Sequence, residues 1–318
     1  MTVYKRRYRV CLPLLWMIFM LIFSEGVLTA IKNALLLCGQ TIIPSLFPFM
    51  IASDLLLQAG VGDLPMPPFF EKVTRRLFSV SAAGFCAFFV GLLCGFPIGA
   101  KFIADLYRSG KIGTEEATRL LCFCNNTGPA FLIAGVGISL LHSKALGITL
   151  YCIQILSALV CGLLLTRLKP GDNKIQISMA SEEKRPRDFS SVIRSNVQNM
   201  LAVCGTVIFF SSTLGLLGEV LQNRVLLSII SSFLEVGSAS AMASELFSSM
   251  PKFAFLLLTL AVNFGGLSVH MQAACLFRDL PVSFGRYILA KWMQACIALL
   301  LSMFLYSLLH FFPQYDIL

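Results

Sequence analysis

The stretch from Leu121 to Gly137 reads LCFCNNTGPAFLIAGVG, and it is polar in the middle although both flanks are apolar. The tripeptide Asn125–Thr127 is followed directly by Gly128-Pro129. Proline lacks a backbone donor and disfavours helix in the residue before it, so the pattern predicts a broken helix with a new helix beginning near Pro129. The positive end of that second helix points back at the polar turn, where it favours a carboxylate.

The composition around this stretch suits a lipid bilayer. Of the 318 residues, 57% are hydrophobic and 13% are charged, and the mean hydropathy is +0.81. Soluble domains carry roughly 45–50% apolar and about 25% charged residues. We therefore expect an all-α integral membrane protein with several spans. At membrane depth a broken helix is tolerated only inside protein or beside a water-filled cavity, so the polar turn predicts a site.

Charge sets the expected orientation. The net charge is +9, and four basic residues precede the apolar run from Val10 to Phe23. We expect residues 1–29 to form an uncleaved transmembrane span with a cytoplasmic N-terminus, a cleavable signal peptide being the alternative. The polar stretch 167–194 is expected to be a cytoplasmic linker, and the C-terminal FFPQYDIL, which lacks Lys and Arg, suits the outer side. No basic surface for nucleic acid is evident.

Two pairs of segments suggest an internal duplication. KNALLLCGQTI (32–42) resembles QNMLAVCGTVI (198–208), and ADLYR (104–108) matches ACLFR (274–278) in the same order. Each short match is weak alone, but both occur at an offset of about half the chain. The pattern predicts two membrane repeats.

The expected orientation makes these repeats inverted. We assign residues 30–166 to the first repeat and residues 195–318 to the second. With the N-terminus and the linker on one side, the first repeat begins outside and the second inside. Inverted repeats with broken helices are typical of secondary transporters, which hold substrate near the bilayer midplane.

Polar residues and helix breakers gather in a few apolar segments, which supply the candidate site. TIIPSLFPFM carries the helix breakers Pro44 and Pro48. The glycine-rich segment from Ser79 to Ala100 is expected to enter the membrane and return on the same side. Thr114 before two glutamates predicts the start of a short interfacial helix. The candidate substrate-binding residues are Ser45, Lys101, Asn125, Asn126, Thr127, Ser268, His270 and Gln272. Glu235 and Asn263 are the candidate ion-coupling residues.

Several of these residues have a plain structural alternative. Lys101 could extend its amine to the interface, and His270 could be a core histidine. Ionisable groups at membrane depth are functional by default, but Glu235 could also pair with an arginine. Single glycines could serve only as helix contacts.

Three stretches of the chain resemble the YlbJ/SpoVV family of sporulation integral membrane proteins. They are GFPIGAKFIADLYRSGKIGTEEATRLLCFCNNTGPAFLIAGVG (95–137), NFGGLSVHMQ (263–272) and PSLFPF (44–49). The resemblance covers most of the chain from about Thr41. It implies nucleoside-recognition (Gate) domains that are distantly similar to concentrative nucleoside transporters. It also implies export of dipicolinic acid from the mother cell across the outer forespore membrane, which derives from the mother cell. Helix amides and Lys101 would then meet the carboxylates, and Phe96 or Phe264 the ring.

Other classes of protein remain as alternatives. The same architecture could carry a nucleoside or another organic anion, or the protein could be a non-transporting sporulation scaffold. GVGD (60–63) matches a pattern of intramembrane aspartyl proteases, but no second aspartate lies in a neighbouring span, so we expect no enzyme. The eleven cysteines lack zinc spacing, and we expect neither metal nor cofactor. The expected partners are a small anionic substrate and the bilayer; a homo-oligomer stays open.

Overall fold

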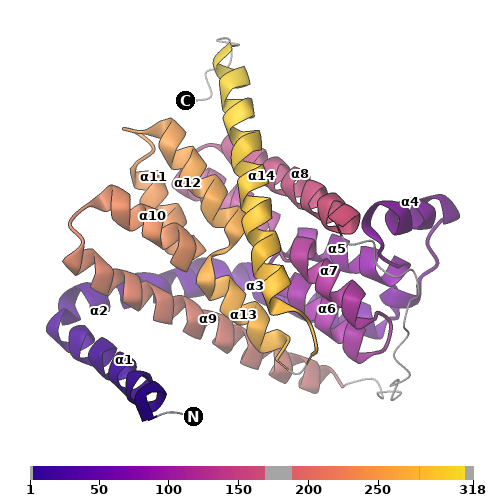
Figure 1. The fold of residues 1–318 in the computed structure, drawn as a ribbon, viewed down its shortest axis with the longest axis horizontal. Coiled ribbons are helices and arrows are strands. Elements are labelled where there is room, and N and C mark those ends of the chain that lie inside the picture. Colours follow the sequence, from indigo (N-terminus) through magenta and orange to yellow (C-terminus); the bar gives the residue numbers. More distant parts are fainter. Residues whose placement is uncertain (1–2, 169–187, 279, 312–318) are drawn as a thin grey trace.

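The computed structural model describes residues 3–168, 188–278 and 280–311, and within these ranges the chain is all-α, without strands (Figure 1). Most of the predicted linker 167–194 and residues 312–318 of the predicted outer tail lie outside the described residues. The predicted all-α, polytopic class is confirmed.

Five helical stretches within the described residues are long and apolar enough to cross a membrane. They are Ser24–Gln58, Lys144–Arg167, Phe189–Val220, Pro251–Leu276 and Phe284–Leu305. A sixth crossing is counted if the pair Pro68–Phe78 and Ala82–Cys94, bent by 79°, is one span. The chain is therefore an integral, multi-pass membrane protein.

The expected first span, residues 1–29, stays a prediction. Helix α1 runs from Val3 to Ile22, but its apolar part, Val10–Ile22, is a short apolar helix rather than one of span length. At 1.5 Å per residue it falls well short of a hydrocarbon core about 30 Å thick. The expected boundary at residue 29 also falls inside α2 (Ser24–Leu37), which begins the first helix long enough to cross.

The predicted helix break at Pro44 and Pro48 is instead a widened turn within one long helix. Helix α2 passes through a π-type turn, η1 (Cys38–Ile42), into α3 (Ile43–Gln58). Pro44 lies in the first turn of α3, where its missing donor costs least. Pro48 lies inside α3 without ending it.

After α3, the first half contains α4 (Pro68–Phe78), α5 (Ala82–Cys94), α6 (Ile98–Arg108), α7 (Thr114–Cys124), the π-type helix η3 (Ala130–Leu140) and α8 (Lys144–Leu168). The second half contains α9 (Phe189–Val220), α10 (Arg224–Leu234), α11 (Val236–Glu245), α12 (Pro251–Phe264), α13 (Gly266–Leu276) and α14 (Phe284–Phe311). Apart from α4, each half has the same order: a long helix, two packed short helices, a broken helix and a long helix. The predicted boundaries and inversion of the repeats stay predictions.

This order changes the equivalence suggested by one sequence match. ADLYR ends α6, the second member of a short-helix pair, whereas ACLFR lies at the end of α13, the second part of a broken helix. The two segments therefore occupy different places in the repeated order. The match KNALLLCGQTI with QNMLAVCGTVI does join the first long helices, α2 and α9, which pack against each other.

In each half the short-helix pair touches the broken helix where both change direction. Gly95, at φ +78° between α5 and α6, lies so close to Gly128 that an added Cβ would come within 2.4 Å of its nitrogen. Gly266, at φ +70° in the break between α12 and α13, lies against Leu234 at the end of α10, where a Cβ would come within 3.0 Å of the carbonyl oxygen. Glycine is needed at both places because any side chain would separate the chains.

Three further predictions can be compared with the helices. Residues 79–100 form α5, the turn at Gly95 and the start of α6, which packs back on α5, and their entry into the membrane and return on one side stays a prediction. Helix α7 begins at Thr114 as predicted, although its residues from Ala117 to Cys124 are largely buried rather than interfacial. The helix after the polar turn begins at Ala130, next to Pro129.

Candidate functional site

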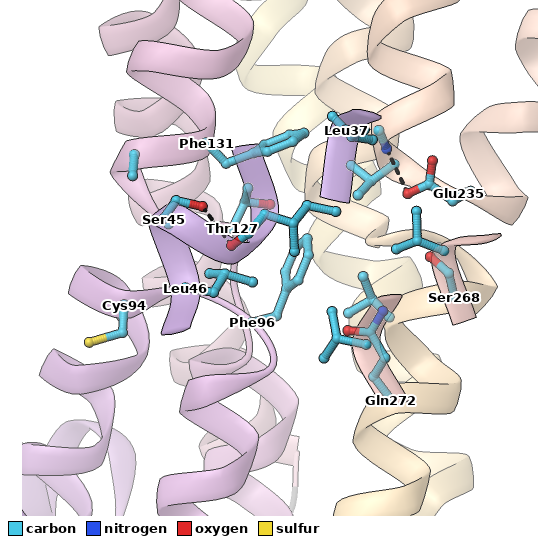
Figure 2. A pocket seen from close by; sticks show the side chains of 18 residues that line it. Leu37, Ser45, Leu46, Cys94, Phe96, Thr127, Phe131, Glu235, Ser268 and Gln272 are labelled. Atoms are coloured by element: carbon cyan, nitrogen blue, oxygen red, sulfur yellow. Dashed lines mark hydrogen bonds between the residues drawn. The ribbon is translucent and has the colours of Figure 1, made fainter. Parts of the chain in front are cut away.

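A small cavity of about 50 Å³ lies where the two halves meet. Figure 2 shows Ser45, Phe96 and Thr127 of the first half facing Glu235, Ser268 and Gln272 of the second half across this space. Five of these six residues are candidates named from the sequence as site residues, and Phe96 was named for the ring of a ligand. The fold thus brings Ser45 together with Ser268 and Gln272, which lie more than 200 residues further along the chain.

Three helices begin at the cavity. The lining includes Gly128 just before η3, Val236 at the start of α11 and Ser268 in the first turn of α13. The first N–H groups of a helix have no intrahelical partner, and the helix dipole makes that end positive. The starts of η3 and α13 therefore favour negative charge near the cavity, and the start of α11 is already capped by the Glu235 carboxylate.

Two buried polar atoms at the cavity lack a hydrogen-bond partner. They are the hydroxyl oxygen of Ser268 and the Oε1 atom of Gln272. The Nε2 atom of Gln272 is held by Thr206 Oγ1 at 2.9 Å, so the amide is fixed while its oxygen stays unused. Because buried polar atoms are almost always paired, these two indicate a partner in the cavity, a ligand or a water molecule.

Glu235 places a carboxylate at one edge of the cavity. It caps α11, accepting from Gly237 N at 2.8 Å and Ser238 N at 2.5 Å, and only 1% of the residue is exposed. Among the described residues no basic side chain forms an ion pair with it, so the arginine partner considered from the sequence is not found there. Its carboxylate occupies the kind of position that a bound anion takes at a helix N-terminus.

The polar turn of the opening stretch is the centre of a buried network. Asn125 Nδ2 donates to the Tyr287 hydroxyl at 2.9 Å, and Asn126 Oδ1 accepts from Gln294 Nε2 at 2.8 Å. Thr127 Oγ1 donates to the Val262 carbonyl at 2.9 Å, and Thr127 also lines the cavity. The two asparagines are therefore turned mainly toward protein, and Thr127 reaches the cavity.

Sequence reasoning missed the three partners on α14, namely Tyr287, Lys291 and Gln294. Lys291 Nζ donates to the Asn125 carbonyl and to Gln294 Oε1, both at 2.8 Å. A signal was available, because a lysine and a glutamine three residues apart lie in the middle of an otherwise apolar span. Ionisable residues at such places are functional by default.

Lys101 lies in an ion pair rather than at the cavity. Its ammonium contacts Asp54, and lies 3.1 Å from Asp105 Oδ2. Asn196 on α9 donates to the other oxygen of Asp54 at 2.8 Å. This cluster joins α3, α6 and α9 and leaves Lys101 outside the cavity lining.

His270 and Asn263 are also buried beside the cavity rather than in its lining. His270 Nδ1 lies 2.9 Å from the Tyr287 hydroxyl, and its Nε2 atom has no partner. Asn263 Oδ1 accepts from Ser157 Oγ at 2.9 Å. Phe264, proposed for a ligand ring, packs against His270 with ring centroids 4.7 Å apart. Among the described residues no cluster of three or more metal-binding side chains occurs.

A larger pocket of about 500 Å³, here called the vestibule, adjoins the cavity. It is lined by α2, η1, η3, α9, α10 and α11, and its polar residues include Gln40, Ser211 and Ser238. Leu37, Phe131 and Gly237 line both the vestibule and the cavity. These three residues therefore form the partition between the two spaces.

The chain is similar to the sporulation integral membrane protein YlbJ of Bacillus subtilis (strain 168). The two sequences are 27% identical over 319 aligned positions, which cover 88% of this chain and 78% of that protein. No family model and no solved structure matches the chain. The similarity confirms the YlbJ part of the predicted resemblance, and the Gate-domain assignment stays a prediction.

Proposed function

We propose that the chain is a member of the YlbJ family of sporulation integral membrane proteins and that it carries a small organic anion, dipicolinic acid, across a membrane. The observation that supports this is the cavity between the halves, where three helix N-termini meet two unpartnered polar atoms. Helix N-termini favour carboxylates, and the Ser268 hydroxyl can donate to one. Gln272 Oε1 only accepts, so it meets a water molecule or a protonated carboxyl group of the ligand.

The size of the cavity indicates a closed state. A cavity that holds benzene has a volume of about 150 Å³. The central cavity, at about 50 Å³, admits only a few water molecules, so an aromatic dianion requires the halves or the partition to move. The vestibule, at about 500 Å³, is large enough and is the proposed entrance.

Glu235 supplies a reason for coupling to protons. A substrate carboxylate and the Glu235 carboxylate compete for the same positive helix ends. Two like charges in a space of low dielectric repel strongly, so the anion binds best when Glu235 is protonated. We propose that Glu235, rather than Asn263, is the coupling group.

The proposed location follows the family and the charges. We propose the cell membrane or the outer forespore membrane derived from it, with the N-terminus in the cytoplasm and transport out of the mother cell. The protein acts as a transporter and not as an enzyme.

The test is flux of dipicolinate in proteoliposomes of the purified protein. We expect Ser268→Ala to reduce flux about tenfold or more, because it loses a hydrogen bond donated to a charged ligand. Gln272→Ala should also reduce flux, because Gln272 Oε1 accepts from a water molecule or a protonated carboxyl group of the ligand. Ser231→Ala is the matched control, since Ser231 is buried and donates only to the Ser228 carbonyl, away from the cavity. Unchanged flux in both cavity variants would contradict the proposed site.

The same assay separates the alternatives. Inhibition by an excess of uridine that exceeds inhibition by unlabelled dipicolinate would favour a nucleoside carrier. Folded protein that gives no flux of either compound under proton or sodium gradients would favour a scaffold.

A further inference from the structure

Lys291 is a buried cation that contacts only neutral oxygens. The residue is 2% exposed. Its Nζ atom lies 2.8 Å from the Asn125 carbonyl oxygen, 2.8 Å from Gln294 Oε1 and 3.3 Å from Asn126 Oδ1. Among the described residues no carboxylate forms an ion pair with it. The three donors of the ammonium group are matched by these three acceptors.

The place of this ammonium group is that of a bound cation. Helix α7 ends at Cys124, and Asn125 is its C-cap residue. The C-terminal carbonyls of a helix carry partial negative charge and have no intrahelical donor. In transporters with broken helices, unwound carbonyls and helix C-termini of this kind coordinate the coupling cation. Here a side chain of the same protein fills that position.

The neighbouring oxygens are already used. Gln294 Nε2 donates to Asn126 Oδ1 at 2.8 Å and lies 3.5 Å from Asn263 Oδ1. Asn263 Oδ1 also accepts from Ser157 Oγ. Asn126 Oδ1, Asn263 Oδ1 and Gln294 Oε1 therefore meet donors, whereas Asn125 Oδ1 is buried without a partner. A second cation on the Asn125 carbonyl, Asn126 Oδ1 and Gln294 Oε1 would have to displace Lys291.

We propose that the Lys291 ammonium group permanently occupies the cation-binding position at the break between α7 and η3. This position therefore binds no sodium ion. Lys291 is a positioning residue in this proposal: it fixes Asn125 and Asn126, and the next residue, Thr127, lines the cavity. The consequence for transport, coupling without sodium, rests on the proposed function, but the occupancy of the break does not.

Chemical rescue tests the occupancy directly. Lys291→Ala removes an aminopropyl group and leaves a space that n-propylammonium matches. The melting temperature of the detergent-solubilised variant is measured in equal concentrations of choline, sodium and n-propylammonium chloride. We expect n-propylammonium, and to a smaller degree sodium, to raise it by several degrees above choline. Lys144→Ala, which removes an exposed lysine at the start of α8, and the wild type should show no such difference.

Lys291→Met adds a control for space, because its side chain fills the position without a charge. It should not respond to the amine. An equal melting temperature of Lys291→Ala in all three salts would overturn the proposal, because a purely structural lysine gives no cation-specific rescue.

If Lys291→Ala does not fold, the melting temperature of the wild type in sodium and in choline provides the test. Equal stability in sodium and choline then supports the proposal, and a rise of several degrees specific to sodium overturns it by placing a metal ion in the core. Because the melting experiment needs no substrate, it stands whether or not dipicolinate flux is found. Where flux is found, replacing sodium with choline should leave it unchanged in the wild type.

Discussion

The hydroxyl oxygen of Tyr287 lies 2.9 Å from Nδ1 of His270, and the same oxygen accepts a hydrogen bond from Asn125 Nδ2 at 2.9 Å. Tyr287 is fully buried on α14. One phenol group therefore joins the break of the first half, at Asn125, to the helix α13 of the second half, at His270. The two breaks are fixed relative to each other by an atom that lies outside the cavity.

Tyr287→Phe should destabilise the protein without altering the cavity lining. The variant leaves Asn125 Nδ2 and His270 Nδ1 without this partner, at a cost of about 1–3 kcal/mol for the buried groups. The melting temperature in detergent is the measurement. Tyr151→Phe is the control, since Tyr151 is only partly buried and makes one bond, to the Leu92 carbonyl at 3.1 Å. Equal decreases in melting temperature in both variants would show that the Tyr287 hydroxyl bonds to Asn125 and His270 add no stability.

The packing of α5 on the polar break depends on Gly91. A Cβ at Gly91 would lie 2.3 Å from the Cys124 carbonyl oxygen, which is backbone and cannot rotate away. Gly91→Ala should therefore push α5 from α7 and destabilise the protein by roughly 1–3 kcal/mol. Gly205→Ala on α9 is the matched control, because a Cβ added there would meet nothing within 4 Å and alanine favours helix by up to about 1 kcal/mol. The two variants should shift the melting temperature in opposite directions.

Substitutions in the ion pair of Lys101 with Asp54 test whether Lys101 stabilises the fold or contacts the substrate. Lys101→Met leaves a buried carboxylate without its cation, which costs about 3–5 kcal/mol. The double variant Asp54→Asn with Lys101→Met should recover most of this stability, since Asn196 can still donate to residue 54 and Arg108 still pairs with Asp105 at 3.3 Å. A recovered melting temperature with lost dipicolinate flux would instead make Lys101 a substrate contact.

The sequence predicted the polar centre because its signals are local. Asn125–Thr127 interrupts an apolar run, and the glycines and serine of NFGGLSVHMQ interrupt another. Both segments break in the structure, and Thr127, Ser268 and Gln272 line the cavity. A polar group placed in an apolar segment has to be satisfied by protein or water, so its presence alone indicates an interior site.

The remaining features depend on contacts between distant residues. Nothing near Lys101 in the sequence indicates that Asp54, 47 positions earlier, takes its charge. Lys291 is a charge in an apolar span, but its role depends on oxygens of the polar turn that lie about 165 positions away. Pro44 and Pro48 were expected to break a helix, but the chain continues as helix from the π-type turn at Cys38–Ile42 through α3. Such outcomes are set by packing and not by local propensity.

Blocking the vestibule tests whether the cavity is reached through it. Ala241 lines the vestibule on α11 and is exposed, so tryptophan at this position has room to fold while filling part of the 500 Å³ space. Ala241→Trp should preserve the melting temperature and reduce dipicolinate flux to near background, because the ring of the substrate can no longer approach the partition formed by Leu37, Phe131 and Gly237. Ala145→Trp is the control, since Ala145 is exposed on α8 and lines none of the pockets described above. Normal flux in Ala241→Trp would move the entrance to another face of the molecule, while a loss in both tryptophan variants would point to a general effect of added bulk.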